Sequence, residues 1–422
     1  MYRFTFILLL SFLASNIFGQ SPNKLLLRSY WKEKPTLETI QSDVALGNDP
    51  AAFDAHKFNP VTWAILEDAS TEIVLFLLKC TGNDVNLKAH DGRTPIFWAA
   101  YRGNVALMQE LIKNGATLNV VDDHGMSVVN FAASTGQTAT ELYELCVKNG
   151  VQFPNEKTPE GATPLLLVIP YLKNPSEIDY FTQKGLKLSH TDEAGNNAFT
   201  YAARTGNEVM LTFLKEKGLN PKANNDAAML FACKGTRNNP NNVETFQLLE
   251  KLGVSPTAED REHQNALHYL SSSSRDTTVY QYFLSSGVDL HQRDVHGATP
   301  LLKAVASNSS EVIHFLLRSG ALPTAMNSTG ENALHIAVKR GDSRILKTII
   351  DTGIDLNGIT NDGLTALHIA AMTAKNLELL TILVNAGADR NLRTPFDETA
   401  FDLSLENEII QSQKESLQFL KP

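Results

Sequence analysis

The chain has 422 residues, of which 43% are apolar and 20% charged, with 37 basic against 46 acidic side chains. This length exceeds the size at which a single hydrophobic core usually stops growing, so we expect either several domains or a linear stack of repeats. The net charge of −9 disfavours nucleic acid as a partner, because the Lys and Arg residues are scattered among acids.

The first 19 residues have the pattern of a secretory signal peptide. Arg3 supplies a positive charge, residues 4–18 form a short apolar run, and Gly19 is a small residue at which a signal peptidase can cut. We predict cleavage after Gly19, which removes Arg3 and leaves 36 basic against 46 acidic residues, a net charge of −10. The alternative is an uncleaved membrane anchor. Because no later stretch is long and apolar enough to span a bilayer, we expect an exported, periplasmic or secreted protein without membrane contact after cleavage.

A glycine recurs along the rest of the chain, each time just after an apolar segment with helical periodicity, and successive copies are 33 to 35 residues apart. The copies are Gly82, Gly115, Gly150, Gly185, Gly218, Gly253, Gly287, Gly320, Gly353 and Gly387. A second phrase recurs in register with them, as GRTPIFWAA from Gly92, GATPLLKAV from Gly297 and GLTALHIAA from Gly363. Self-similarity at a fixed period predicts a repeat architecture and leaves little room for globular domains.

Residues 91–121 show which elements one period predicts. Thr94 and Pro95 open a first helix, because Pro suits the first turn, where its missing N–H has no acceptor to lose, and Thr can cap that turn. Ala99 and Ala100 give this helix a small apolar face that lets a neighbouring helix come close. A Gly-Asn pair then ends it, and a second helix with apolar residues at helical spacing ends at Gly115.

A period near 33 with a T-P-L-H-x-A-like phrase strongly resembles the ankyrin repeat. The resemblance covers about ten repeats at residues 60–394, between a linker with a degenerate capping repeat at 20–59 and a C-terminal capping repeat at 395–422. It implies an all-α solenoid of helix-turn-helix units joined by short hairpin-like loops, in which each unit is stabilised by stacking on the next. It also implies that the chain binds other proteins, and bacterial proteins of this kind are often exported. We expect a monomer.

The sequence contains few residues in a catalytic or metal-binding pattern. His268, His335 and His368 stand in the A-L-H phrase, where the resemblance implies a structural histidine that bonds to backbone between repeats. No familiar catalytic or phosphate-binding motif is present, and no pair of histidines has metal-ligand spacing. We therefore predict no enzyme activity, no cofactor and no metal site. The three cysteines stand in apolar helical patterns, which favours buried small hydrophobes over a redox role. They are Cys80, Cys146 and Cys233.

The resemblance places the partner-binding surface at the loop tips before each first helix and at the two positions after the paired Ala. The candidates in the first regular repeats are His90, Asp91, Arg93, Tyr101, Arg102, Asp123, His124, Met126, Ser134 and Thr135. Farther along they are Glu193, Asn196, Arg204, Thr205, His296, Glu331, Lys339, Arg340, Met372 and Thr373. Tyr and Arg are frequent interface anchors, so Tyr101, Arg102, Arg204 and Arg340 lead the set. The alternative for each residue is an ordinary solvated side chain.

An aromatic residue occupies one equivalent position in five repeats, which suggests either a ligand groove or, as we expect, core packing between first helices. These residues are Trp98, Phe131, Tyr201, Phe231 and Tyr269. The middle repeats depart from the pattern. Residues 235–242 form a long Asn-rich loop, and residues 171–176 and 271–278 are also extended; each is either a second contact edge or tolerated drift.

Three functions follow in order of preference. The first is a non-enzymatic scaffold or binding partner that works outside the cytoplasm through the concave side of the repeats. The second is a secreted effector that binds host proteins. The third is an enzyme with an unrecognised pocket among the irregular middle repeats.

Overall fold

The computed structural model describes residues 23–236 and 240–422, and for residues 412–415 the backbone alone. The predicted signal peptide, its cleavage site and the tip of the Asn-rich loop therefore lie outside the described residues.

Packing divides the chain into two compact units. Unit 1 comprises the described residues up to Phe131 together with Glu141–Asn149, and unit 2 comprises Ala132–Thr140 and Gly150–Pro422. The helices of unit 1 are η1 (Lys24–Leu26), α1 (Arg28–Lys32), α2 (Leu37–Ala45), α3 (Pro60–Leu66), α4 (Thr71–Lys79), η2 (His90–Gly92), α5 (Pro95–Tyr101) and α6 (Val105–Lys113). The helix α7 (Val128–Ser134) begins in unit 1 and ends in unit 2, and α8 (Thr140–Lys148) belongs to unit 1 except for its first residue.

Unit 2 continues the alternation of first and second helices. Its first helices are α9 (Pro164–Val168), α11 (Ala198–Ala202), α13 (Ala223–Lys234), α15 (Ala266–Ser273), α17 (Pro300–Ser307), α19 (Ala333–Arg340), α21 (Ala366–Thr373) and α23 (Ala400–Glu406). Its second helices are α10 (Ile178–Gln183), α12 (Glu208–Glu216), α14 (Val243–Lys251), α16 (Thr277–Ser285), α18 (Ser310–Arg318), α20 (Ser343–Ile350) and α22 (Glu378–Ala386). Short 3-10 turns complete it: η3 (Phe153–Asn155), η4 (Ile169–Tyr171), η5 (Pro175–Glu177) and η6 (Gln411–Leu420).

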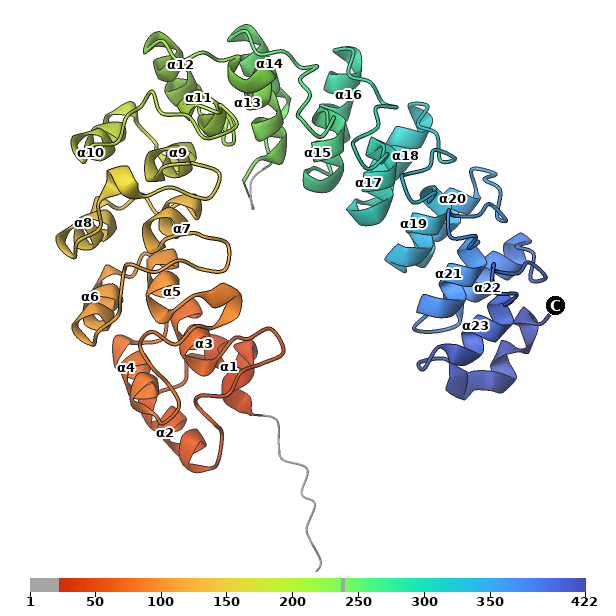
Figure 1. Cartoon of the computed structure of the whole chain (residues 1–422), viewed down its shortest axis with the longest axis horizontal. Helices are drawn as coiled ribbons and strands as arrows, with labels where there is room; N and C mark the ends of the chain where they lie inside the picture. Colours follow the sequence, from red (N-terminus) through yellow and green to blue (C-terminus); the bar gives the residue numbers. More distant parts are fainter. Residues whose placement is uncertain (1–22, 237–239) are drawn as a thin grey trace, which may run out of the picture. The chain divides into compact units, whose positions relative to one another are not determined.

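Most helices of unit 2 pack on their counterparts in the next repeat. The first helices from α11 to α23 form one continuous row, and the second helices from α14 to α22 form a row outside it (Figure 1). A helix pair that cannot bury its own apolar face gains its stability from such stacking. The predicted all-α solenoid of about ten helix pairs is thus confirmed, whereas the exact boundaries of its end segments stay predictions.

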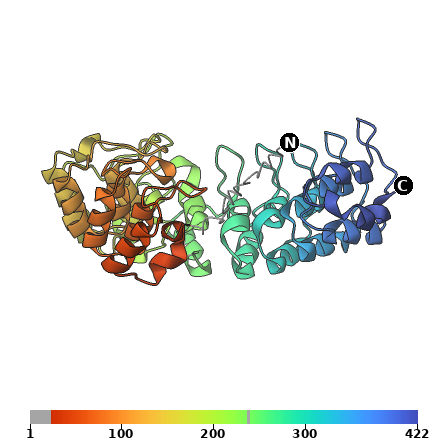
Figure 2. The same cartoon turned by 90° about the horizontal axis from the view of Figure 1, so that it is seen from below.

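The connections between repeats are hairpin-like, as predicted. In the described residues the only ladder pairs are isolated antiparallel bridges at the base of such loops, for example Ile359 with Thr365 and Arg393 with Thr399. Figure 2 shows these loops standing out from one side of the C-terminal repeats. Successive loops are tied by backbone bonds, since Ser328 N–H donates to His296 O at 2.7 Å and Asn361 N–H donates to Thr329 O at 3.0 Å.

The first helices begin as the sequence predicts, with one correction. Pro95, Pro164 and Pro300 each stand in the first turn. The hydroxyl of Thr163 accepts a capping bond, from Leu166 N–H at 3.5 Å. Thr94, by contrast, makes no side-chain cap, and its buried hydroxyl has no partner in the described residues. Its helix is therefore held by packing, since Ile96, Phe97, Ala99 and Ala100 have no exposed surface.

The predicted core is largely confirmed. Trp98, Phe131 and Tyr201 of the aromatic row are buried, at 5%, 7% and 8% exposure, whereas Phe231 and Tyr269 are only half-buried. Among the cysteines, Cys146 and Cys233 are buried as expected. Cys80 is a correction, because it is the residue that caps the end of α4 and is partly exposed.

The three A-L-H histidines have the structural role that the resemblance implies. Each is at most 1% exposed, and its Nδ1 faces the backbone N–H of the residue that caps its own helix, at 3.1–3.3 Å. Each Nε2 donates to a carbonyl of the loop leading to the next repeat: Ala298 O for His268, Gly358 O for His335 and Leu392 O for His368. Burial lowers the pKa of all three rings.

Candidate protein-binding surface

The loop tips of unit 1 bring five of the predicted residues together. At the centre is the Asp91 carboxylate, carried on a left-handed residue with φ 56°. Arg93 Nη1 lies 2.8 Å from Asp91 Oδ2, and Arg93 Nε lies 2.9 Å from Asp122 Oδ2, whose side chain is fully buried. The Arg93 guanidinium also lies 4.1 Å from the centre of the Phe131 ring. Arg93 is therefore an anchor inside the cluster, because both of its ion pairs are formed with acids of the chain itself, which the repeat pattern does not reveal.

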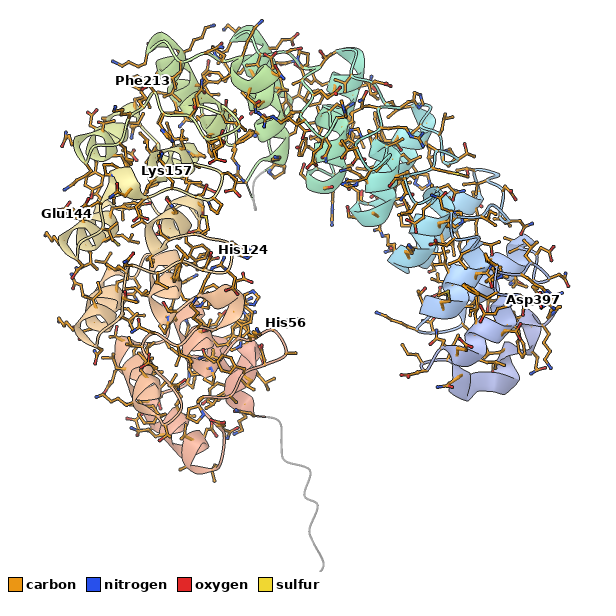
Figure 3. The ribbon with its side chains drawn as sticks, viewed as in Figure 1. His56, His124, Glu144, Lys157, Phe213 and Asp397 are labelled. Atoms are coloured by element: carbon orange, nitrogen blue, oxygen red, sulfur yellow. The ribbon has the colours of Figure 1, made fainter. Side chains whose placement is uncertain are left out.

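Two histidines flank this carboxylate. His90 Nε2 and His124 Nε2 lie 3.5 Å and 3.6 Å from Asp91 Oδ2. The His90 ring stacks on Phe58 with centroids 4.1 Å apart, and its Nδ1 donates to His56 O at 2.8 Å. His124 is 62% exposed, and Asp123 beside it is also exposed. Figure 3 labels His56 and His124 on the loop side of unit 1. The cluster thus presents exposed polar groups on a rigid, aromatic base.

The positions after the paired Ala in unit 1 are less available than predicted. Tyr101 stacks on Phe131, with centroids 5.9 Å apart. Arg102 forms a two-point ion pair with Asp68, in which Nε lies 2.9 Å from Oδ1 and Nη2 contacts Oδ2. This pairing raises the pKa of Arg102. Both side chains contribute surface, but each already makes a contact within the chain.

Several candidates in unit 2 connect neighbouring repeats. Arg204 Nε donates to Gly235 O at 3.1 Å, and Arg340 Nη1 donates to Val305 O at 2.9 Å. Lys339 pairs with Glu331. Asn196, a candidate surface residue, is buried and bonded to Asp192, which corrects that prediction. The exposed candidates that remain are Glu193, His296, Met372 and Thr373.

Sequence reasoning missed one exposed residue on this side, Lys234 at the end of α13. It occupies the position equivalent to Tyr101 and Arg204, so the repeat register could have revealed it. The repeat that contains Lys234 reads DAAMLFACKG and lacks the T-P-L-H signature, so its alignment with the other repeats is less obvious.

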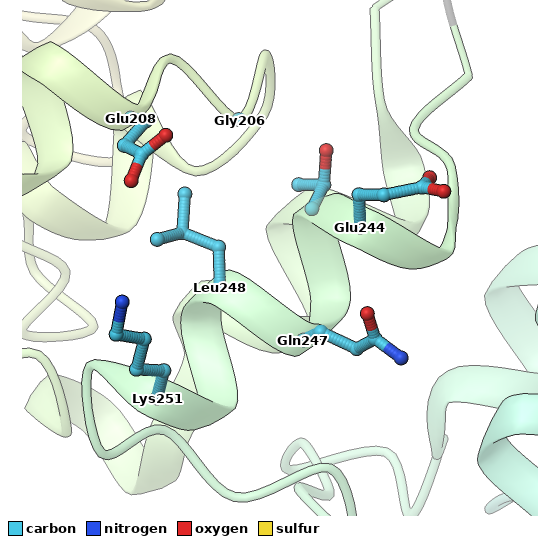
Figure 4. A pocket seen from close by; sticks show the side chains of 7 residues that line it. Gly206, Glu208, Glu244, Gln247, Leu248 and Lys251 are labelled. Carbon is cyan, nitrogen blue, oxygen red and sulfur yellow. The ribbon is translucent and has the colours of Figure 1, made fainter.

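A groove of about 350 Å³ lies between α12 and α14, among the irregular middle repeats. Its lining residues are Gly206, Glu208, Glu244, Thr245, Gln247, Leu248 and Lys251. Figure 4 shows Glu208 and Lys251 on the side of Leu248, whereas Glu244 and Gln247 point away from them. All four polar side chains are exposed to solvent. The groove therefore lacks the converging polar groups that the enzyme hypothesis needs at this place.

None of the described helices is both long and apolar enough to cross a membrane. No group of three or more His, Cys, Asp or Glu side chains within the described part of the chain is arranged to hold a metal ion.

These features define a helical repeat protein whose loop tips and first helices carry its polar surface groups. A family model for ankyrin repeats (three copies) matches residues 61–153, 229–327 and 323–394, more than half of the chain. The chain belongs to the ankyrin-repeat family, whose repeats are protein–protein interaction modules. Residues 154–228 lie outside the match, yet α9–α12 continue the helix pairs there.

The curated relatives are much longer proteins. Phosphocholine transferase AnkX of Legionella pneumophila is 24% identical over 244 residues, which is 57% of this chain and 23% of the relative. E3 ubiquitin-protein ligase KEG of Arabidopsis thaliana is 23% identical over 310 residues, 73% of this chain and 17% of the relative. An L-asparaginase of Dirofilaria immitis is 29% identical over 226 residues, 54% of this chain and 26% of the relative. The match thus spans about a quarter or less of each relative's length.

Proposed function

We propose that the chain is a non-enzymatic binding protein that works outside the cytoplasm and holds a partner protein on its loop tips and first helices. The observation that supports this most is the unit 1 cluster, where Asp91, Asp123 and His124 present polar groups on a base fixed by Arg93 and stacked aromatic rings. A prearranged surface loses little side-chain entropy on binding.

The test is affinity capture from the extracytoplasmic fraction with matched variants. His124→Ala removes an exposed loop-tip ring, and Gln109→Ala removes an exposed side chain of the second helix α6. We expect a specific partner that is recovered with the wild type and with Gln109→Ala but is reduced about five-fold or more with His124→Ala. Equal recovery of the partner with both variants would show that the loop tips are not the binding surface.

Export rests on the pattern of residues 1–19. Expression of the full chain, followed by N-terminal sequencing of the extracytoplasmic product, tests it. The expected first residue is Gln20. Retention of the product in the cell envelope agrees with a scaffold, and release into the medium favours the effector alternative.

A further inference from the structure

Two cations occupy equivalent positions in consecutive repeats of unit 2. Arg204 and Lys234 both stand seven residues after the start of the first-helix phrase, where Lys339 stands in a regular repeat. Arg204 Nε donates to the carbonyl of Gly235, the residue next to Lys234. The two positive charges are close enough to act on each other, since Arg204 contributes to lowering the pKa of Lys234.

In the regular repeat the corresponding charge is neutralised locally. Lys339 pairs with Glu331, eight residues before it. The same kind of pairing satisfies Lys303, whose Nζ lies 3.0 Å from Asp294 Oδ2, and Arg340, which lies 4.0 Å from Asp342 Oδ2.

Arg204 and Lys234 lack this arrangement. The residue eight positions before Arg204 is Asn196, a neutral amide, which is bonded to Asp192. The residue eight positions before Lys234 is Asp226, but its backbone is left-handed with φ 60° and its Oδ1 accepts Ser255 N–H at 3.0 Å. Within the described residues, neither cation has a carboxylate within ion-pair distance.

The surroundings of Lys234 strengthen the need for a counter-charge. Its Nζ lies 4.6 Å from the centre of the Tyr269 ring and 5.2 Å from that of Phe231, both half-buried. Although Lys234 has solvent-accessible surface, desolvation by the protein packed around it lowers its pKa, and the charges of Asp260 and Glu262 oppose this shift. The Asp260 carboxylate is occupied by the Tyr269 hydroxyl and by the Glu262 and Gln264 N–H groups.

We infer that Arg204 and Lys234 form an anion subsite on the first-helix side, which takes carboxylate side chains from an acidic segment of a partner protein. Equivalent positions on packed helices lie about 8–10 Å apart, and carboxylates two or three residues apart on an extended segment span about 7–10 Å. The rings of Phe231 and Tyr269 offer such a segment apolar contact beside the charges. The inference rests on the proposed function, because it names the chemistry of the partner.

The probe is a fluorescein-labelled hexaglutamate peptide, and its binding to the full chain is measured by fluorescence anisotropy at low salt and at 0.5 M salt. At 0.5 M salt, exposed charges that are more than about 4–5 Å apart are screened from each other. We expect Lys234→Gln to weaken hexaglutamate binding about five-fold and the double variant with Arg204→Gln about ten-fold or more. Lys234→Arg retains binding, because it keeps the charge. A hexaglutamine peptide with the same label binds at most weakly.

The matched control is Lys217→Gln. Lys217 Nζ lies 5.3 Å from the Phe213 ring, so this variant loses the same charge and the same kind of ring contact. Phe213 lies on the second helix α12, on the outer side of the first helices (Figure 3). Unchanged hexaglutamate affinity in Lys234→Gln, or an equal loss in Lys217→Gln, overturns the inference. Since Arg204→Gln removes the bond to Gly235, melting curves of each variant establish that it is folded, and Lys234→Gln carries the test alone if the double variant is not.

A labelled hexathymidine oligonucleotide serves as the competing polyanion, and binding as tight as that of hexaglutamate overturns the assignment to an acidic protein segment. The outcome is independent of the partner-capture experiment. Loss of capture in His124→Ala with no effect of Lys234→Gln on the peptide refutes the subsite and leaves the proposed function standing. Peptide binding that depends on Lys234, without any captured partner, supports the subsite and counts against the proposed function.

Discussion

The buried A-L-H histidines make the stability of unit 2 depend on pH, and His368 offers the clearest test. Its Nδ1 lies 3.1 Å from Thr365 N–H and 3.0 Å from the Thr365 hydroxyl, and its Nε2 lies 3.0 Å from Leu392 O. Because a backbone donor faces Nδ1 and a carbonyl faces Nε2, the geometry favours the neutral ring protonated at Nε2. A proton added at Nδ1 would meet the N–H group of Thr365.

The sign and size of the effect follow from the lowered pKa of the ring. An unfolded histidine takes up a proton below about pH 6.5, whereas burial lowers the pKa of the His368 ring, which therefore takes up its proton only at a lower pH. Stability is therefore complete above about pH 6.5 and falls as the pH decreases, by up to about 1.4 kcal/mol per pH unit for each such ring. His268 and His335 are also buried and have a lowered pKa, but in place of the Thr365 hydroxyl the side-chain oxygens of Asn265 and Asn332 lie 2.8 Å and 2.7 Å from their Nδ1 atoms. The three together give up to about 4 kcal/mol per pH unit.

Urea unfolding followed by far-UV circular dichroism at pH 7.5, 6.5 and 5.5 measures this slope. His368→Gln lowers stability at pH 7.5, because it disturbs two buried hydrogen bonds, but it also makes the dependence on pH shallower by about a third. His314→Gln is the control, since His314 is exposed on α18 and bonded only within its own helix. An unchanged slope in His368→Gln would refute the assignment of a neutral buried ring.

Two further predictions concern other local features. Gly330→Ala destabilises the fold by about 2–3 kcal/mol in the same unfolding assay, because φ is 78° and a Cβ would lie 2.6 Å from Asn361 N. The control is Gly320→Ala, which is also left-handed but in open space and costs about 1 kcal/mol. Equal losses of stability in the two variants would contradict the steric argument. A thiol reagent such as dithionitrobenzoate labels Cys80 alone in the native chain, slowly, because burial raises the pKa of that thiol; reaction of Cys146 or Cys233 before unfolding would contradict their burial.

Much of the fold was predictable because its determinants are local and repeated. The glycine period, the proline of the first turn and the paired alanines each act within one repeat, so the helix pairs and the A-L-H histidines follow from the sequence. Thr94 and Cys80 were mispredicted for a different reason. Whether a hydroxyl finds an N–H donor, or a helix ends before a thiol is covered, depends on a shift of one residue that periodicity does not resolve.

The candidate surface was harder to predict, because position in the repeat does not determine whether a charge is free. Arg93, Arg102 and Lys339 stand at positions typical of partner contacts, yet each is paired with an acid of the chain itself. Asp68, the partner of Arg102, comes from the preceding repeat, 34 residues away. Such pairings are tertiary, and the period reports only which residues are equivalent.

Sequence and structure together explain why Arg204 and Lys234 both lack an ion pair. The sequence alone shows an amide eight residues before Arg204 and an acid eight residues before Lys234, so it would predict that only Arg204 lacks a counter-charge. The left-handed backbone at Asp226 turns that acid toward Ser255 N–H and leaves Lys234 without it as well. The amide at position 196 and the irregular backbone of α13 together leave two neighbouring cations without an ion pair among the described residues, in a chain whose net charge is −9. For this reason the irregular repeat, and not the regular ones, is where an acidic segment gains most from binding.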